Sequence, residues 1–377
     1  MTLDSVDHKI LWIGTYPAHY MRKMHCEVER AKPGAMHFIY IPYSDQSSRM
    51  AYERGSLPES CDVLDAEESL AKFYGLLRKH NPRALIISGY SSRFLVCAHV
   101  WAWLNRRKYM YYSDTNFLDV MQNKFVLRSA KWIVLRLVLG RTHKLLYVGS
   151  RNRDFYIWLL GRSRVSDKLY MLPLPAILGK RPDETKVRDR HESFKILYLG
   201  RLEPEKGIEK LLRSTALLSP AIKSSLRVSI VGDGSEAEHL KELSRNLKIS
   251  NVVEFHGSLA SDEVDGAYHE ADLFVLPSEK EPWGLVVNEA LSAGLPVMCP
   301  YWVGSAADLV IDGITGFLLD SNAPESIARG IEIAFGQRDT LQIMGSNGAR
   351  HVNNGPWHSA AAIEKLVALI ENVLAIG

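Results

Sequence analysis

Short apolar runs alternate with longer segments of helical periodicity along most of the chain. Residues 10–13, 109–112 and 194–199 consist almost entirely of Ile, Leu, Met, Phe, Trp and Tyr, a composition typical of buried strands. Further strands are expected at 226–231, 252–255, 273–276 and 295–299. Strands that alternate with helices of ten or more residues predict parallel, doubly wound α/β sheets. Ligands of such sheets bind outside the carboxyl ends of the strands.

Two glutamates flank the predicted start of a helix in the second half of the chain. A turn at 281–284 leads into a helix over 286–293, so Glu281 lies on the loop and Glu289 one to two turns inside the helix. Backbone N–H groups at a helix start lack internal partners and can bind phosphate, while carboxylates can bind sugar hydroxyls. Here those groups belong to Gly284, Leu285 and Val286. The pattern suits a nucleotide sugar, although two solvated glutamates would give the same pattern.

A second candidate segment follows the strand at 194–199. It runs from Gly200 to Gly207 and contains Arg201 and Lys206, five positions apart, before a helix expected at 208–218. An Arg offers a planar fork and a Lys a point charge, and the glycines let the backbone approach a ligand. Strand, turn, cations and helix in this order indicate a diphosphate site.

The strand at 226–231 is followed by Gly232 and Gly234 in a G-x-G-x-x-A pattern, with Glu254 about twenty positions on, at the expected end of the next strand. This pattern matches a dinucleotide-binding fingerprint and keeps an NAD-dependent oxidoreductase open as an alternative. However, a tight turn between strand and helix favours glycine in any doubly wound sheet, and the fingerprint normally sits on the first strand, not the second. The turn is therefore interpreted as lining the site of Arg201 and Lys206.

These motifs resemble those of retaining glycosyltransferases of family 4, which have the GT-B fold. Gly200 to Gly207 matches the family's Gly-Arg-x-x-x-x-Lys-Gly, and the segment at 281–284 with Glu289 matches its Glu-Gly-Phe-Gly and later Glu, with Pro for Gly and Trp for Phe as departures. The resemblance is strong over about residues 194–335. It implies that Arg201 and Lys206 neutralise the leaving diphosphate, that Glu281 contacts the donor sugar and that Glu289 binds the ribose.

The resemblance also implies the architecture. It predicts two Rossmann-like doubly wound domains facing each other across a cleft, with the C-terminal helix crossing back to the first domain. We expect an acceptor-side domain at residues 1–180 with a final helix at about 358–377, and a donor-binding domain at 193–356. The break is expected within 179–192, a stretch rich in charged residues.

Candidate residues in the first half are fewer. The family's first loop is glycine-rich, but here only Gly14 remains, and the resemblance assigns it to the donor phosphates. His19 can face the cleft as a proton carrier or can be an ordinary loop histidine. Asp114, which follows the strand at 109–112, is the candidate acceptor-side group, with a helix N-cap as the alternative role.

The function expected from these features is retaining transfer of a sugar from a nucleoside-diphosphate donor to a hydroxyl acceptor, in polysaccharide, lipopolysaccharide or glycolipid biosynthesis. A UDP-sugar is the first expectation for the donor and a GDP-sugar the second. No cofactor and no metal are expected, because the two cations do the work of Mg²⁺ and no Asp-x-Asp pair is present. A catalytically silent protein that keeps the fold is a further alternative.

Composition supports a two-domain globular protein in a reducing compartment. The chain has 377 residues, 46% of them apolar and 24% charged, with four scattered cysteines and no apolar run long enough to span a bilayer. No signal peptide is visible at the N-terminus. These features predict a cytoplasmic protein.

Charge divides the two halves. Residues 1–182 contain 28 Lys/Arg against 15 Asp/Glu, whereas residues 183–377 contain 18 against 28. Basic residues gather at 101–108, beside two tryptophans, and along 124–144. Such segments can lie on an anionic membrane, so a membrane-borne or other glycan acceptor is expected at the first domain, with a solvated basic face as the alternative. No nucleic-acid recognition motif accompanies these runs.

Overall fold

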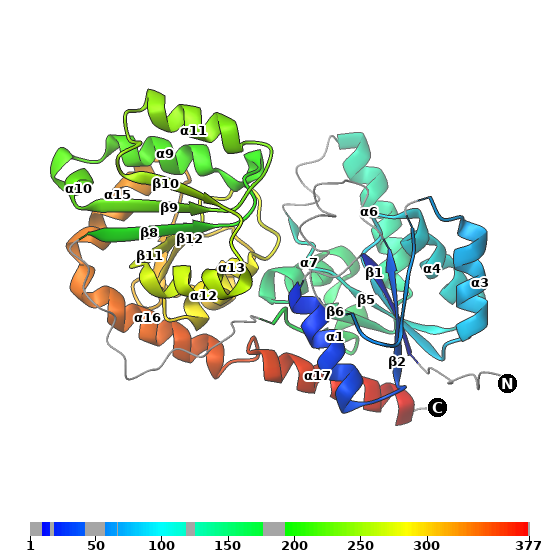
Figure 1. The fold of residues 1–377 in the computed structure, drawn as a ribbon. Helices are drawn as coiled ribbons and strands as arrows, with labels where there is room; N and C mark the ends of the chain where they lie inside the picture. Colours follow the sequence, from blue (N-terminus) through cyan, green and yellow to red (C-terminus); the bar gives the residue numbers. More distant parts are fainter. Residues whose placement is uncertain are drawn as a thin grey trace. The chain divides into compact units, whose positions relative to one another are not determined.

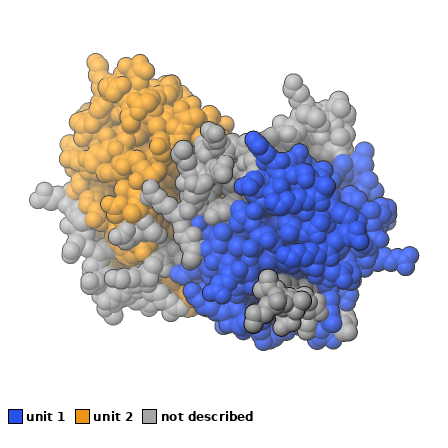
Figure 2. All heavy atoms as spheres, turned by 45° about the vertical axis from the view of Figure 1, so that its right-hand side comes forward, with its two compact units in different colours: residues 1–175, 359–377 blue, residues 176–358 orange. Residues whose placement is uncertain are grey.

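The structure is a computed structural model that describes residues 10–15, 19–41, 57–65, 67–117, 125–175 and 193–375, and within these the side chains other than 19–20, 125–131 and 261–262. The chain forms two compact units, residues 1–175 with 359–377 and residues 176–358 (Figure 2). The segment at 179–192 lies outside the described residues. No helix in the described part of the chain has both the length and the apolar character needed to cross a bilayer.

The described part of the first unit contains a seven-stranded sheet in the order β3-β2-β1-β4-β5-β6-β7, with every neighbouring pair parallel. Its strands are β1 (Ile10–Thr15), β2 (Met36–Ile41), β3 (Cys61–Val63), β4 (Ala84–Ser88), β5 (Lys108–Tyr112), β6 (Lys144–Tyr147) and β7 (Leu169–Met171). Its helices are α1 (His19–Ala31), α3 (Leu70–His80), α4 (Arg93–Leu104), α6 (Phe125–Gly140), α7 (Ser150–Leu160), α8 (Arg162–Val165) and α17 (Ser359–Ala375).

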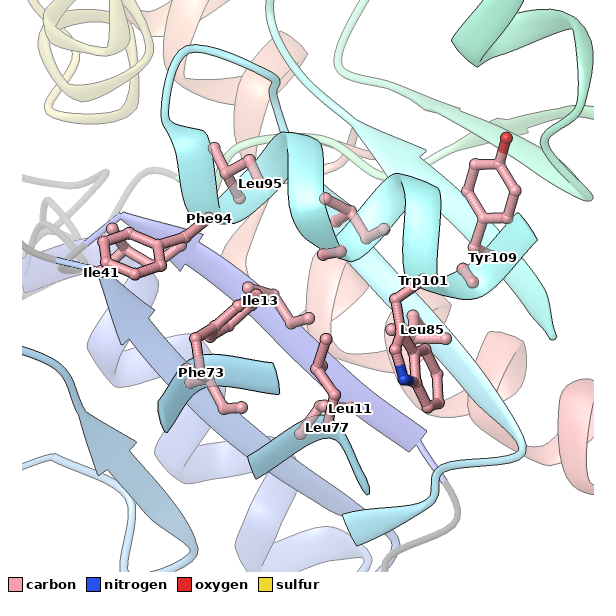
Figure 3. Close-up of a cluster of buried hydrophobic side chains, with 14 of the residues drawn as sticks. Leu11, Ile13, Ile41, Phe73, Leu77, Leu85, Phe94, Leu95, Trp101 and Tyr109 are labelled. Atoms are coloured by element: carbon pink, nitrogen blue, oxygen red, sulfur yellow. The ribbon is translucent and has the colours of Figure 1, made fainter. Parts of the chain in front are cut away.

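The strands of this sheet are mostly apolar because both faces are covered, and the exceptions include His37 in β2 and Asp62 in β3. In β1, Leu11 and Ile13 point into a cluster with Phe73 of α3 and Phe94 of α4 (Figure 3). Trp12 points to the opposite face and packs against His25 of α1, with 4.7 Å between ring centroids. Alternate residues of one strand therefore serve two separate core layers.

The last helix, α17, belongs to the first unit although it follows the second in sequence. It packs against α1, and the hydroxyl of Tyr170 in β7 donates to the carbonyl of Lys365 at 2.7 Å. The predicted return of the C-terminal helix is confirmed.

The described part of the second unit contains a six-stranded parallel sheet in the order β10-β9-β8-β11-β12-β13. Its strands are β8 (Phe194–Leu199), β9 (Leu226–Val231), β10 (Val253–Gly257), β11 (Leu273–Val275), β12 (Val297–Pro300) and β13 (Gly316–Leu319). Its helices are η1 (Pro204–Lys206), α9 (Ile208–Leu217), α10 (Pro220–Ser224), α11 (Ala237–Asn246), α12 (Ser261–Glu270), α13 (Leu285–Ser292), α14 (Ala306–Leu309), α15 (Pro324–Gly336) and α16 (Arg338–Asn353).

Helices cover both faces of this second sheet as well. Helices α9, α11 and α15 lie on one face, and α12, α13 and α16 lie on the other (Figure 1). Both units thus have the doubly wound α/β architecture predicted from the sequence. Counted from the first strand of each unit, both sheets contain the strand order 3-2-1-4-5-6 of a Rossmann fold, and the first sheet has a seventh strand, β7, next to β6.

Candidate functional site

The strand order places the two strongest motifs at one position of the second sheet. Strand β8 pairs with β9 on one side and β11 on the other, and the connections leave in opposite directions from these two strands. The loop after β8 contains residues 200–207, and the loop after β11 contains residues 277–284. Such a switch point is where doubly wound sheets bind ligands, because the two diverging loops leave a crevice at the carboxyl ends of the strands.

The two loops are fastened to each other by backbone and side-chain contacts. The amide of Glu279 donates to the carbonyl of Glu205 at 2.9 Å, and Lys210 forms an ion pair with Glu279 at 2.7 Å. Gly207 has φ +68°, and a Cβ at this position would lie 2.4 Å from the carbonyl oxygen of Pro277. Glycine is therefore required here by both backbone conformation and close approach.

Lys206 and Glu281 meet between these loops. Lys206 Nζ lies 2.7 Å from Glu281 Oε2, and the two side chains are only 15% and 10% exposed. The hydroxyl of Ser278 donates to the same carboxylate oxygen at 3.3 Å. An ammonium group has three donors, so Lys206 can keep this bond and still donate to an anion. The structure thus brings together two predicted site residues that are 75 positions apart.

Arg201 lies on the same loop, immediately after the end of β8. The hydroxyl of Tyr198 donates to the Arg201 carbonyl at 2.8 Å, which fixes the backbone, while the side chain is about half exposed. Its guanidinium donates to Glu205 through Nη2 at 3.2 Å. A guanidinium has five N–H donors, so this contact leaves it able to bind an oxyanion.

The helix predicted after the second loop is α13, and it begins at Leu285, one residue earlier than expected. Gly284 precedes it at φ +88°, and no side chain caps the helix. A Cβ on Gly284 would lie 2.9 Å from Cγ of Glu281, so the glycine also gives that carboxylate its place. Leu285 and Val286 are half-buried in the first turn. An uncapped helix start beside a cation is a suitable anion site.

The departures from the family motif are accommodated within this loop. Trp283 is buried, and its indole donates to Oδ1 of the buried Asn288 at 3.0 Å. The carbonyl of Trp283 accepts from the Ser305 amide at 2.8 Å, and that of Glu281 accepts from the Gly304 amide at 3.0 Å. Tryptophan therefore acts as an anchor that ties the loop to its own helix.

Glu289 is the fifth residue of α13, where the sequence predicted it. Its carboxylate accepts a hydrogen bond from the hydroxyl of Tyr268 at 2.8 Å and is almost fully buried. Burial raises the pKa of Glu289 to about 7, while the hydrogen bond from Tyr268 opposes the shift. The carboxyl of Glu289 is therefore close to half ionised at neutral pH, and hydrogen bonds from further hydroxyl groups would favour its ionised form.

The glycines of the apparent dinucleotide fingerprint are explained by packing. A Cβ on Gly232 would lie 1.8 Å from the carbonyl oxygen of Gly200, and one on Gly234 would lie 2.4 Å from that of Leu202. Hydrogen bonds also join these loops, among them those from the Leu202 amide to the Asp233 carbonyl at 2.9 Å and from the Ser235 hydroxyl to Glu203 at 2.7 Å. The glycines let this turn support the loop of Arg201 and Lys206.

The acidic residue of the same pattern is not where a ribose-binding carboxylate is expected. Glu254 is the second residue of β10, not its last, and its side chain is 62% exposed. The expectation that it ends the strand is wrong. The strand continues for three residues beyond Glu254, to Gly257.

Candidate residues of the first unit lie at the corresponding edge of the first sheet. Gly14 is the next-to-last residue of β1, and a Cβ there would lie 3.1 Å from Cβ of Ser88 at the end of the neighbouring β4. Asp114 follows the end of the next strand, β5, and is half-buried. The alternative N-cap role of Asp114 stays a prediction, because residues 118–124 lie outside the described part of the chain. His19 begins α1, and its side chain lies outside the described residues.

Several residues that shape the site were not recognised in the sequence. Tyr198 and Tyr268 hold Arg201 and Glu289, and both sit at apolar positions of their elements, where a tyrosine resembles any core aromatic. Ser278 lies three residues after the end of β11, and this position just beyond a strand was the available signal.

Comparison with known proteins agrees with this geometry. Residues 180–351 match the model of the family Glycosyl transferases group 1. The D-inositol 3-phosphate glycosyltransferase of Streptomyces griseus is 33% identical over 174 residues, which cover 44% of this chain and 37% of that protein. The chain thus spans well under half the length of this curated relative, and the similarity lies in a limited segment.

Several solved structures match nearly the whole chain, among them the following two. The sucrose-phosphate synthase of Thermosynechococcus elongatus has a TM-score of 0.76 at 17% identity, covering 98% of this chain and 99% of that chain. HepE of Anabaena in complex with UDP has a TM-score of 0.75 at 18% identity, covering 97% and 100%. At such identities these matches define the fold alone.

The predicted GT-B fold is confirmed. Residues 180–351, a little under half of the chain, are similar to the family Glycosyl transferases group 1, as the motifs indicated. The family match includes the loops at 200–207 and 277–284, the turn at Gly232 and the helix α13.

Proposed function

We propose that this protein is a glycosyltransferase that moves a sugar from a nucleoside-diphosphate donor to a hydroxyl acceptor with retention of anomeric configuration. The observation that carries the proposal is the buried pair of Lys206 and Glu281, 2.7 Å apart beside the uncapped start of α13 at the switch point of the second sheet. Cations, free N–H groups and a carboxylate at one place suit a diphosphate joined to a sugar.

In the proposed reaction, the bond between the sugar C1 and the β-phosphate oxygen breaks, and a bond from C1 to the acceptor oxygen forms. The departing diphosphate gains one negative charge, which Arg201 and Lys206 stabilise from fixed positions. The acceptor proton passes to a phosphate oxygen of the departing nucleotide. Glu281 orients the donor sugar, and Glu289 accepts hydrogen bonds from the ribose. These roles are metal-independent because the two cations supply the stabilising charge.

The donor proposed first is a UDP-sugar, with a GDP-sugar second. HepE, which shares the fold, has been solved with UDP and with UDP-glucose. Retention and membership of family 4 are proposed on the motif at 281–284 with Glu289. The proposed pathway is the synthesis of a polysaccharide, lipopolysaccharide or glycolipid.

A thermal-shift screen of nucleoside diphosphates and their sugar conjugates tests the donor assignment, because a ligand of the native state raises the melting temperature by mass action. UDP or GDP conjugates should raise it, and chelating agents should leave the shift unchanged. A shift with NAD and none with any nucleoside diphosphate would favour the oxidoreductase alternative. Proton NMR of the first product then reports whether the anomeric configuration is retained.

We further propose that the acceptor is presented at an anionic membrane surface. Trp103 and Leu104 at the end of α4 are 54% and 68% exposed, and on α6 Ile133 and Leu137 are more than half exposed. The guanidinium of Arg141 stacks 5.0 Å above the Trp103 ring. Exposed aromatic and aliphatic groups beside a cation are typical of helices that lie on lipid.

Some other residues of the predicted basic segments have structural roles. Trp101 is buried in the core beneath α4, so one of the two tryptophans is structural. Arg136 and Lys144 donate to the backbone carbonyls of Leu159 and Asp167. The side chains of Lys124, Arg128 and Lys131 lie outside those that the structure describes.

Co-sedimentation with vesicles tests this surface. Wild type should bind vesicles containing anionic lipid, with a loss of binding at high salt because each basic group near the lipid contributes about 1 kcal/mol. The variant Leu104→Ser should bind less, whereas Ile343→Ser, at an equally exposed position of α16, should bind as wild type does. Equal binding by both variants would reject the surface.

A further inference from the structure

Three polar side chains of the first unit converge on one point away from the residues discussed so far. Nε2 of His37 and Nε2 of His80 lie 2.8 Å and 3.0 Å from the same oxygen, Oδ2 of Asp62. The two imidazole rings stack with 4.1 Å between their centroids. Both histidine side chains are less than 10% exposed, and that of Asp62 is one third exposed.

The fold explains why these residues meet. Ile39 of β2 is the register partner of Asp62 in β3, and His37 lies two residues before Ile39, on the same face of the sheet. Ile39 packs in the core with Leu77 of α3, and His80 is the last residue of that helix, about one turn further on. His37 is near the amino end of its strand, whereas Gly14 and Asp114 lie at the carboxyl ends. The cluster is thus at the opposite edge of the sheet from the expected ligand side.

The donor set and its spacing suit a transition-metal ion. Imidazole nitrogens and a carboxylate oxygen are common zinc ligands at about 2.0–2.2 Å, and a tetrahedron with such bonds has edges of about 3.3 Å. The observed nitrogen-to-oxygen distances of 2.8 Å and 3.0 Å are close to that edge, and all three atoms lie within 4.8 Å of one another. The position is also at the C-terminal end of α3, where the helix dipole favours a cation.

We propose that His37, Asp62 and His80 form a binding site for a divalent transition-metal ion of the zinc type. The ion takes one nitrogen from each histidine and one carboxylate oxygen, and a water from the exposed side of Asp62 completes a tetrahedron. Bound there, it joins the edge strand β3 to β2 and to the end of α3. Its role is to hold this edge of the first unit in place, and it takes no part in the proposed sugar transfer.

Sequence spacing gives no hint of this site. The ligands are separated by 25 and 18 positions and come from two strands and a helix, so none of the short ligand spacings of sequence motifs appears. Parallel pairing of β2 with β3 and the length of α3 bring them together.

Zinc titration of the full chain, free of any affinity tag, tests the proposal. Competition with a chromophoric chelator should show one Zn²⁺ bound per chain in wild type. His80→Gln and Asp62→Asn should each weaken the binding at least tenfold, and Zn²⁺ should raise the melting temperature of wild type but not of these variants. Circular dichroism checks that each variant is folded. If one of the two variants is unfolded, the other still tests the proposal.

Matched controls are available in the second unit. His239 and His256 are exposed, and each lies about 4 Å from a single carboxylate, Glu209 and Glu254. His239→Gln and His256→Gln should therefore bind Zn²⁺ as wild type does. X-ray absorption of the zinc-loaded protein should show nitrogen and oxygen neighbours with imidazole scattering. Binding that is equal in wild type and His80→Gln, or a shell containing sulfur, would overturn the assignment.

Discussion

Replacing Lys206 with alanine should destabilise the protein far more than replacing an ordinary lysine. Lys206 and Glu281 are 15% and 10% exposed, and removal of the lysine leaves a buried carboxylate without its counter-charge. Breaking a buried pair in this way costs about 3–5 kcal/mol of unfolding free energy.

A neighbouring ion pair supplies a matched control. Lys210, in the first turn of α9, and Glu279, in the loop at 277–284, are also 2.7 Å apart, but their side chains are 29% and 51% exposed. An exposed pair is worth about 0–1 kcal/mol, so Lys210→Ala should be nearly neutral. The double variant Lys206→Met with Glu281→Gln removes both charges and should recover most of the stability lost in Lys206→Ala.

Urea unfolding at pH 7 measures these differences, and a turnover assay on the same samples separates stability from catalysis. Transfer should fall about 100-fold to 1,000-fold in Lys206→Ala and in the stable double variant, because the departing diphosphate loses a fixed cation. Lys210→Ala should turn over normally. If Lys206→Ala proves as stable as Lys210→Ala, the buried-pair reasoning is refuted, and if the double variant is fully active, Lys206 has no role in transfer.

Three further outcomes follow from the structure. The pKa of Glu289 is raised to about 7, above the unfolded value of 4.5, so its protonation stabilises the folded state by about 3 kcal/mol below about pH 4.5, and this stabilisation is lost as the pH rises through 7. Because ribose binding needs the ionised form, the donor affinity measured by calorimetry should rise about tenfold from pH 6 to pH 8. An affinity that does not change with pH would contradict the ribose role. Gly234→Ala should lower the melting temperature by several degrees, because its Cβ would lie 2.4 Å from the carbonyl oxygen of Leu202. Gly266→Ala, in open space on α12, should leave the melting temperature unchanged. Equal melting temperatures in the two variants would show that the turn adapts to the added methyl group. His25 is buried and neutral, and burial lowers its pKa to about 3, so the folded state should lose about 2 kcal/mol of stability between pH 7 and pH 5 through this group. The difference in unfolding free energy between wild type and His25→Phe, measured by urea titration at the two pH values, should therefore narrow by that amount. A difference that stays constant would show that His25 is protonated in the folded state.

Much of the second unit was predictable because its elements are locally determined. The strand at 194–199 and the strand at 226–231 have the predicted bounds, since short, mainly apolar runs between turn residues leave little ambiguity. The placement of Arg201 and Lys206 followed from the rule that loops after parallel strands share one edge of the sheet. The pairing of Lys206 with Glu281 needed the strand order, because only adjacency of β8 and β11 brings their loops together.

What the sequence could not reveal was the use made of particular side chains. Gly232 and Gly234 match a nucleotide fingerprint, yet their reason is the approach of the carbonyls of Gly200 and Leu202. Two tryptophans two residues apart in a helix point in different directions, so Trp101 is core and Trp103 is surface. The cluster around Asp62 depends on packing between distant elements, which no local pattern encodes.

The most direct test of the central claim is calorimetric titration of UDP, and of GDP if UDP gives no heat, into the full chain. One nucleoside diphosphate should bind per chain, and the stable double variant Lys206→Met with Glu281→Gln should bind at least tenfold more weakly, while Lys210→Ala binds as wild type does. Absence of binding by any nucleoside diphosphate, or equal affinity in the double variant, would contradict the assignment of the loops at 200–207 and 277–284 as the donor site.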